Sequence, residues 1–294
     1  MTARAPAWFE TKYIDGAIHV LQTAGYRLKG MFATKTNQKG IDITWKVAGS
    51  GDATPLSDAI EDRPTLNADR TTITARMQDW EANEWIKTTD LTKMTENEIQ
   101  VAQKSCAMAI GRRFDQIPLR VLDAAVAATT VSVVGNGTAQ ISPLDLLTAQ
   151  ANIQDTGVDG NLMLNVALTP RHLAQLLTYR ELVNSDYITD TPLMKQIGAR
   201  RWLGMNIIPL PSTYLNSPSA NVRDGFMWVS DAVGFATNTD AEGRHDLSTR
   251  IDYVPTKKSY FAANTLSATA AVILPGAIQA LRFLDTPPAT RPNP

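Results

Sequence analysis

The sequence predicts an α+β fold in which one long helix separates two regions of different character. Residues 95–126 carry apolar side chains at helical spacing. Before the helix, residues 41–47 and 71–77 alternate between apolar and polar side chains, which is the pattern of half-buried strands. After it, residues 248–284 form an apolar, strand-rich chain end that has to pack on a core. An extended polar region and a mixed helix-and-strand region are therefore expected on either side of the helix.

The helix has recognisable start and interruption signals. Thr95 and Glu98 form a capping box, in which the Thr hydroxyl accepts from an exposed N–H and the Glu side chain reaches back to the cap. Pro118 cannot donate an N–H and crowds the preceding turn, so we expect a kink or a break there. Cys106, the only cysteine, lies on the apolar stripe as a small buried residue and excludes an intrachain disulfide.

Composition limits the class of protein. The chain has 294 residues, of which 44% are apolar and 19% are charged, which is enough for a real core. A net charge of −1 leaves no overall basic field to recruit nucleic acid. The N-terminus lacks the apolar run of a signal peptide, and the most apolar late stretch, residues 268–281, is too short to span a bilayer. We expect a soluble protein without a membrane partner.

The two alternating segments before the helix predict a long hairpin. Ile41, Ile43 and Trp45 share a face in the first strand, and Ile73 and Met77 share a face in the second. A polar connection of about twenty residues, long for a compact domain, separates the two strands. An isolated hairpin is marginal in water. We therefore expect another molecule to cover this apolar face, which makes these five residues candidate assembly residues.

Charged residues around the hairpin add to this candidate surface. From Met31 to Thr95 there are eight Lys or Arg and ten Asp or Glu, a mixed-sign surface suited to charge-complementary contacts, and Asp62 and Arg63 belong to it. Arg200 and Arg201 form a basic pair later in the chain. Such a pair is either ordinary surface charge, part of an assembly contact, or a contact to packaged nucleic acid.

The region after the helix predicts several short elements. Residues 131–141 are expected to form a hairpin that turns at 135–137. Helices should start at Ser142 and Thr169, each followed by Pro. Strands are expected over residues 161–168, 200–211 and 226–229, and the Pro-rich tail 285–294 has nothing to bury.

The sequence offers no catalytic constellation. His19, His172 and His245 are far apart and lack metal-ligand spacing. Neither a nucleophile elbow nor a phosphate-binding loop is found. We therefore expect no enzyme activity, no cofactor and no metal.

Three segments carry a resemblance to a known family. AIGRRFDQIPLRVLDAA resembles the end of a capsid spine helix, LTPRHLAQLL resembles a strand-to-helix step of an axial domain, and DTPLMKQIGARRWLGMNIIPLP resembles the strand after a capsomer-tip loop. Together with the order of elements, over about residues 5–284, they make the chain similar to the major capsid proteins of tailed bacteriophages, the Hong Kong 97 fold.

This resemblance implies a division of the chain into parts. Residues 1–30 would be an N-terminal arm and 31–94 an extended loop. Residues 95–130 and 248–284 would form the peripheral domain with its spine helix. Residues 131–247 would form a mixed α/β axial domain, followed by the tail 285–294.

The resemblance also implies a function. The chain would assemble with itself into hexamers and pentamers of an icosahedral head that encloses double-stranded DNA, first in the host bacterial cytoplasm and finally in the virion. Separate scaffolding and portal proteins, and decoration proteins, would be its partners. The alternatives are an encapsulin-like compartment that loads protein cargo and a soluble enzyme of unknown chemistry.

Overall fold

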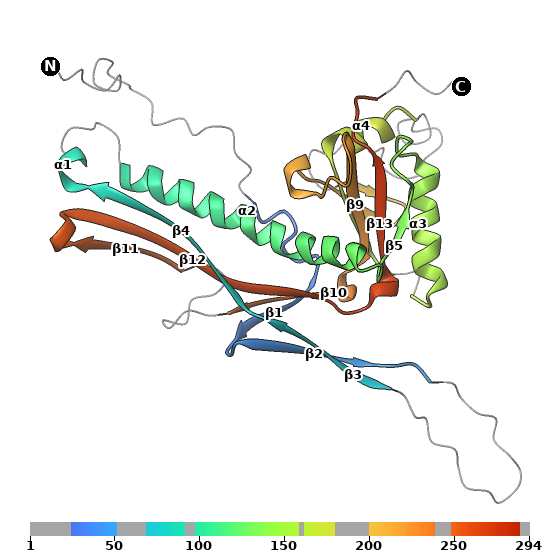
Figure 1. Ribbon diagram of the computed structural model, residues 1–294, viewed down its shortest axis with the longest axis horizontal. Helices are drawn as coiled ribbons and strands as arrows, with labels where there is room; N and C mark the ends of the chain where they lie inside the picture. The colour runs from blue at the N-terminus through green and yellow to red at the C-terminus, as the bar shows by residue number, and fades with distance from the viewer. Residues whose placement is uncertain are drawn as a thin grey trace, which may run out of the picture.

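The fold contains two sheets, a projecting hairpin and one long helix (Figure 1). The computed structural model describes residues 25–51, 69–91, 98–158, 162–179, 200–238 and 248–288. Within these ranges a five-stranded and a six-stranded sheet lie at different positions along the long helix, and a two-stranded hairpin points away from both. The expected α+β class is confirmed.

The long helix, α2 (Glu98–Ala127), runs through Pro118 without ending. Of the kink or break expected at Pro118, the break is therefore wrong. Pro118 is buried, and its neighbours Ile117 and Leu119 are 8% and 0% exposed. We attribute the continuity to this packing, which offsets the hydrogen bond that proline removes. Thr95, the expected cap, lies outside the described residues.

The five-stranded sheet follows the helix along much of its length. Its strands are β1 (Ala33–Gln38), β4 (Gln78–Lys87), β10 (Val233–Asn238), β11 (Ser248–Val254) and β12 (Ser259–Val272). β12 is central: it pairs with β4, β10 and β11, and β1 joins the edge of β10 in parallel. One face of the sheet lies against α2, where Ala262, Leu266 and Ala268 are at most 1% exposed.

The hairpin consists of β2 (Asp42–Ala48) and β3 (Arg70–Arg76). The strands are antiparallel, with Asp42 opposite Arg76 and Ala48 opposite Arg70. Both alternating strands predicted from the sequence are thus confirmed. β1 and β4 belong to the five-stranded sheet, so the projecting part is shorter than the expected loop of residues 31–94.

The six-stranded sheet has the order β5-β13-β9-β6-β8-β7. The bounds are β5 (Ser132–Val134), β6 (Leu164–Leu168), β7 (Arg200–Trp202), β8 (Met205–Pro209), β9 (Val222–Val229) and β13 (Ile278–Leu284). β6 is buried at every position, which is typical of a strand covered on both faces. Helix α3 (Pro143–Asp155) packs beside β5 and β13, and α4 (Pro170–Leu176) follows β6 (Figure 1).

The two expected helix starts are confirmed. Ser142 and Asp145 form a capping box in which each side chain bonds the backbone of the other. The Thr169 hydroxyl accepts from the N–H of His172 at 3.1 Å. Short helical turns complete the described elements: α1 (Thr88–Leu91), η3 (Ser212–Tyr214), η4 (Ser230–Ala232), η5 (Pro255–Lys257) and η6 (Pro275–Ala277).

Two local expectations are wrong. Residues 131–141 form no hairpin, because β5 pairs in parallel with the distant strand β13. Gly135 adopts a φ of +86° there, and a Cβ on it would lie 2.5 Å from the Arg282 carbonyl oxygen. Residues 200–211 contain two strands instead of one, because Leu203 and Gly204, with φ of 45° and 76°, reverse the chain between β7 and β8.

The strand pairing also moves the expected domain limits. β13 belongs to the six-stranded sheet and β10 to the five-stranded one, so residues 248–284 do not all lie with α2 and residues 131–247 do not all lie in the second sheet. The start of the tail is buried as well: Asp285 is 4% exposed and accepts from the Thr169 hydroxyl at 2.6 Å. The expectation that residue 285 has nothing to bury is therefore wrong.

Candidate assembly surface

The base of the hairpin is covered by the chain itself. Ile43 and Trp45 are each 4% exposed and pack against Ala236 of β10 and Ala271 of β12. A Cβ on Gly234 would lie 2.5 Å from the Trp45 ring, so only glycine admits this contact. The expectation that another molecule must cover these two side chains is wrong at the hairpin base.

The other candidate assembly residues lie in different surroundings. Ile73 and Met77 are half-buried and pack against the Ile43–Trp45 cluster. Ile41, just before β2, is 64% exposed. Arg200 begins β7 and Arg201 is exposed on the same strand, so this pair lies in the six-stranded sheet, apart from the hairpin. Asp62 and Arg63 lie outside the described residues.

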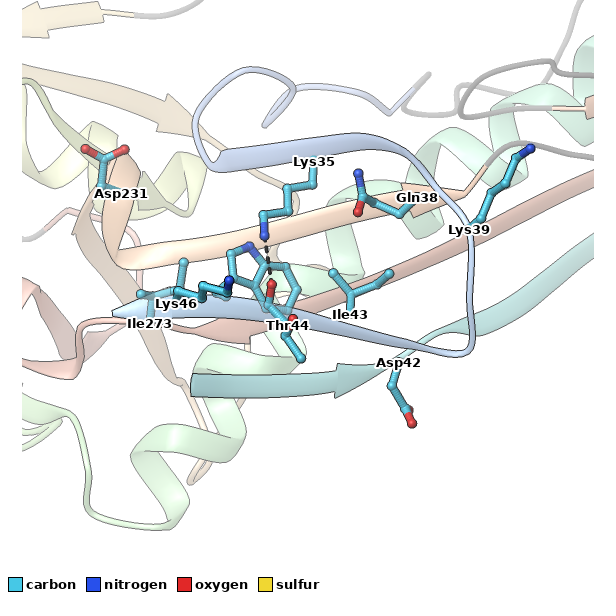
Figure 2. Close-up of a pocket in the computed structure, with 10 residues that line it drawn as sticks. Lys35, Gln38, Lys39, Asp42, Ile43, Thr44, Lys46, Asp231 and Ile273 are labelled. Carbon is cyan, nitrogen blue, oxygen red and sulfur yellow. Dashed lines mark hydrogen bonds between the residues drawn. The ribbon is translucent and has the colours of Figure 1, made fainter. Parts of the chain in front are cut away.

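An open cavity of about 550 Å³, called here the basic groove, lies between β1 and β2 (Figure 2). Three of the residues that line it are lysines and two are aspartates. The full lining is Lys35, Gln38, Lys39, Asp42, Ile43, Thr44, Trp45, Lys46, Asp231 and Ile273. The groove is thus formed by β1, β2 and two residues far along the chain.

Lys35 holds the two walls of the groove together. Its ammonium group donates to the Thr44 carbonyl oxygen at 2.7 Å and lies 5.5 Å from the centre of the Trp45 ring. Figure 2 shows Lys35 reaching from β1 across to β2, with Lys39 at one end and Asp231 at the other. Lys39 and Lys46 are exposed. The groove therefore combines a fixed apolar floor with cationic side chains that face solvent.

Exposed aromatic side chains gather where β4 and β11 end and β12 begins, a surface called here the peripheral tip. Trp85 is 45% and Tyr253 is 48% exposed. The Lys257 ammonium lies 4.1 Å from the centre of the Trp85 ring, a cation–π distance. Phe261 and Tyr260 pack beside Trp85 and Tyr253 at ring-centre distances of 4.4 and 5.3 Å.

The N-terminal segment is attached to α2 by contacts that the sequence pattern did not indicate. Gly25 has a φ of +82°, and a Cβ on it would lie 1.9 Å from the Gly111 backbone, so these two backbone segments of the chain cross closely. The buried Asp115 carboxylate accepts from the N–H groups of Arg27 and Leu28, each at 3.1 Å. The Asp115 carboxylate thus fixes the segment before β1 to the helix.

A second polar cluster joins the end of α2 to the six-stranded sheet. Arg282 donates to both carboxylate oxygens of Asp224 at 2.8 and 2.9 Å, and Asp224 is 1% exposed. Nearby, burial and the Asp224 charge raise the pKa of Asp123 from 3.8 to about 7, with Arg120 opposing the shift. This cluster couples the helix to the sheet electrostatically.

The described residues offer little for catalysis. Burial raises the pKa of the Cys106 thiol, so its nucleophilic thiolate form is disfavoured. Burial also lowers the pKa of His172, a residue of α4 that is 0% exposed. No group of three or more His, Cys, Asp or Glu in the described ranges is placed to hold a metal ion. Among the helices described, none combines the length and apolarity needed to cross a membrane.

A long helix along an extended sheet, with a projecting hairpin and a second, mixed sheet at the helix end, is the Hong Kong 97-like fold. The chain matches the phage capsid protein family over residues 5–285 and belongs to that family. It is accordingly a structural protein of a phage capsid shell, in the virion, and not an enzyme.

Solved capsid structures share this fold at low sequence identity. The capsid of Ralstonia phage GP4 is 11% identical, with a TM-score of 0.70 and 97% of each chain covered. The capsid of the cyanophage P-SCSP1u is 13% identical, with a TM-score of 0.69 and 95% of this chain and 94% of that chain covered. The capsid of the native GTA particle is 11% identical, with a TM-score of 0.67 and 94% and 95% covered. No curated protein sequence matches the chain.

Proposed function

We propose that this chain is a major capsid protein that assembles through hexamers and pentamers into an icosahedral head around double-stranded DNA. The observation that carries the proposal is the family match over residues 5–285, with the fold shared over nearly the whole chain. Assembly takes place in the host bacterial cytoplasm, with separate scaffolding and portal proteins, and decoration proteins on the finished head.

The surfaces of the molecule support self-assembly. The hairpin projects beyond the sheet that covers its base, and Ile41 and the peripheral tip leave apolar side chains exposed. These surfaces differ from one another, so contacts between them are heterologous, and such contacts close into rings when the rotation permits. Many moderate contacts repeated around a shell then give stability through multivalency.

The candidate assembly residues take different parts in this proposal. Ile43, Trp45, Ile73 and Met77 hold the hairpin in position, and Ile41 contacts a neighbour directly. Asp62 and Arg63 contribute charge to the connection, residues 49–69. Arg200 and Arg201 contribute a basic pair from the six-stranded sheet, of which Arg201 is exposed, to either a subunit contact or packaged DNA.

Replacing residues 49–69 by Asn-Gly tests the assembly role of the hairpin. Ala48 and Arg70 face each other in the ladder, so a two-residue turn can join them without changing the register. The expected product keeps the circular dichroism spectrum and thermal midpoint of the full chain but forms no shells by electron microscopy. A control keeps the length of 21 residues and the composition but scrambles their order. Normal closed particles from the shortened chain would contradict the assembly role.

The enclosed material separates the proposed head from an encapsulin-like compartment. Native particles treated with nuclease and then opened should release protected double-stranded DNA of uniform length. Particles that instead contain a protein cargo and no protected DNA would refute the genome-enclosing role while leaving shell formation intact.

A further inference from the structure

The basic groove has the chemistry of a receptor for an acidic segment. Its three lysines outnumber its two aspartates, and Figure 2 shows Asp42 pointing away from the Lys35–Thr44 contact and Asp231 at one end. The middle of the groove is therefore more cationic than the numbers of lysines and aspartates in the whole lining suggest. Lys39 and Lys46 have no hydrogen-bond or ion-pair partner among the described residues and are exposed.

The floor of the groove is rigid and carries a donor without an acceptor. Trp45 packs on Gly234 and is 4% exposed, so its ring cannot easily change place. Within the described parts of the chain its indole N–H has no hydrogen-bond acceptor. This N–H is itself buried against Gly234, so an occupant would be bound by the lysine side chains and not by the indole.

The chain itself contains a segment with the complementary charge. Residues 49–69 include the acids Asp52, Asp58, Glu61, Asp62 and Asp69 and a single base, Arg63, which gives a net charge of −4. Carboxylates attract ammonium groups over several ångströms and select the register of a contact, even when each pair adds little affinity.

We propose that the basic groove of one copy receives the acidic connection, residues 49–69, of a second copy. This inference rests on the proposed shell-forming function and names the surface that the projecting hairpin engages. It makes the contact heterologous, with the connection of one copy placed between β1 and β2 of the next.

The course of the hairpin favours a second copy over the same chain. β2 and β3 stay paired to Ala48 and Arg70, and the Gly49 N–H still donates to the Asp69 carbonyl oxygen at 2.6 Å. The paired chain thus continues beyond Lys46 and away from the groove (Figure 1). The described ends of the connection, residues 49–51 and 69, therefore lead away from the lysines of their own groove, which favours the groove of another copy as the receptor.

Carbodiimide cross-linking of assembled particles tests the contact directly, because the reagent joins carboxylates to amines that already touch. Particles assembled from an equal mixture of ¹⁴N and ¹⁵N chains are cross-linked, digested and analysed by mass spectrometry. The expected products join peptides containing Lys35, Lys39 or Lys46 to peptides from residues 49–69, with mixed isotopes. Same-isotope products alone, or groove lysines joined to other acidic segments, would overturn the proposal.

Charge reversal provides a second, functional test. The variant K39E/K46E turns the groove from net +1 to net −3 and is expected to lower shell yield at least about tenfold, since like charges then face each other. Adding D58K, E61K and D62K to the same chain should restore the yield to within about twofold. The matched control K87E/K104E changes two exposed lysines outside the groove by the same charge. If this control lowers shell yield, the substitutions D58K, E61K and D62K, together called the loop reversal, should not restore it.

The outcomes distinguish this inference from the proposed function. If the Asn-Gly replacement abolishes shells but the loop reversal fails to rescue K39E/K46E, residues 49–69 are needed for assembly. The proposal that they bind in the basic groove of a second copy is then wrong. If the Asn-Gly replacement still forms shells, the assembly role itself fails. Thermal midpoints of the free chains, measured for every variant, identify any variant that fails to fold. Where a variant fails to fold, cross-linking of particles made from the unchanged sequence decides whether residues 49–69 bind the groove.

Discussion

The six-stranded sheet and the β2–β3 hairpin contain similar strands but bury them differently. In the sheet, strands from four parts of the chain and the helices beside them bury Phe226 and Trp228 completely. In the hairpin, only Ile43 and Trp45 are buried, and only where the hairpin meets β10 and β12. The sheet is therefore stabilised within one chain, while the far part of the hairpin has no comparable cover among the described residues.

This difference separates folding from assembly. Changes in the six-stranded sheet should unfold the chain, whereas changes at the hairpin should leave it folded and alter what it assembles with. The variants below test that separation, in order from the largest expected effect on stability to the smallest.

Trp228→Ala should have the largest effect. The ring is 0% exposed, stacks on Phe32 at 5.5 Å, and donates through Nε1 to the Met31 carbonyl oxygen at 2.9 Å. Removing it leaves a cavity and reduces the Met31 carbonyl to its longer hydrogen bond from the Asn165 amide at 3.4 Å, at a cost of about 3–5 kcal/mol in the free energy of unfolding. Urea denaturation measures the loss. A loss below about 1 kcal/mol would show that this sheet is not the stable body of the molecule.

Asp224→Asn should cost about 2–3 kcal/mol, because it leaves Arg282 without its ionised partner in a mostly buried position. Asp224 is 1% exposed, while the Arg282 side chain is 29% exposed, and this exposure limits the loss. Asp224→Asn combined with Arg282→Gln should recover part of it in the same denaturation assay. Simple additivity of the two substitutions would indicate that the pair does not act as a unit.

Gly234→Ala and Trp45→Ala should couple strongly. A Cβ at residue 234 would lie 2.5 Å from the Trp45 ring, so Gly234→Ala alone should destabilise the hairpin base by about 1–3 kcal/mol. In the Trp45→Ala background the same change should be nearly neutral. Hydrogen exchange of β2 and β3 amides follows the local effect. Equal costs in both backgrounds would contradict the packing described here.

Asp123 should make stability depend on pH. Its pKa is about 7 in the folded chain against 3.8 for a free side chain, so folding favours the protonated form. The contribution is most favourable below about pH 4 and is lost as pH rises to about 7. Asp123→Asn should therefore raise stability at pH 8 by about 1–2 kcal/mol and change it little near pH 4. Thermal midpoints of both chains across this range measure the difference; a constant difference would exclude titration of Asp123.

Ile41→Ser should change the free energy of unfolding by less than about 0.5 kcal/mol, because the side chain is 64% exposed. Its effect should appear only in shell yield, which light scattering follows. The buried neighbour Ile43→Ser serves as the contrast and should lower stability. An equal loss of stability in both variants would remove the distinction between the hairpin base and its exposed edge.

Local patterns in the sequence predicted the parts of the fold that depend on local structure. The alternation at Ile43 and Trp45 and the caps at Ser142 and Thr169 act within a few residues, and all are found in the structure. β1 was missed because its residues, ATKTNQ, are mostly polar and become a strand only by pairing with β10. The parallel pairing of β5 with β13 joins segments about 145 residues apart, which no local pattern reveals.

The candidate site was less predictable for the same reason. The apolar face of the hairpin was found, but its partner surface on β10 and β12 was not, because Gly234 and Ala271 carry no distinctive local signal. The basic groove combines three lysines near the hairpin with Asp231 and Ile273, which only the fold brings together. Interfaces between copies depend on such combined surfaces.

Electron microscopy of the purified full chain at assembly concentrations tests the central claim most directly. The chain is expected to form closed particles or capsomer rings, because we propose that neighbouring copies cover its exposed hairpin and peripheral tip. A uniformly monomeric preparation that remains folded, and that stays monomeric when a scaffolding protein encoded by the same phage is supplied, would contradict the claim that this molecule builds a shell.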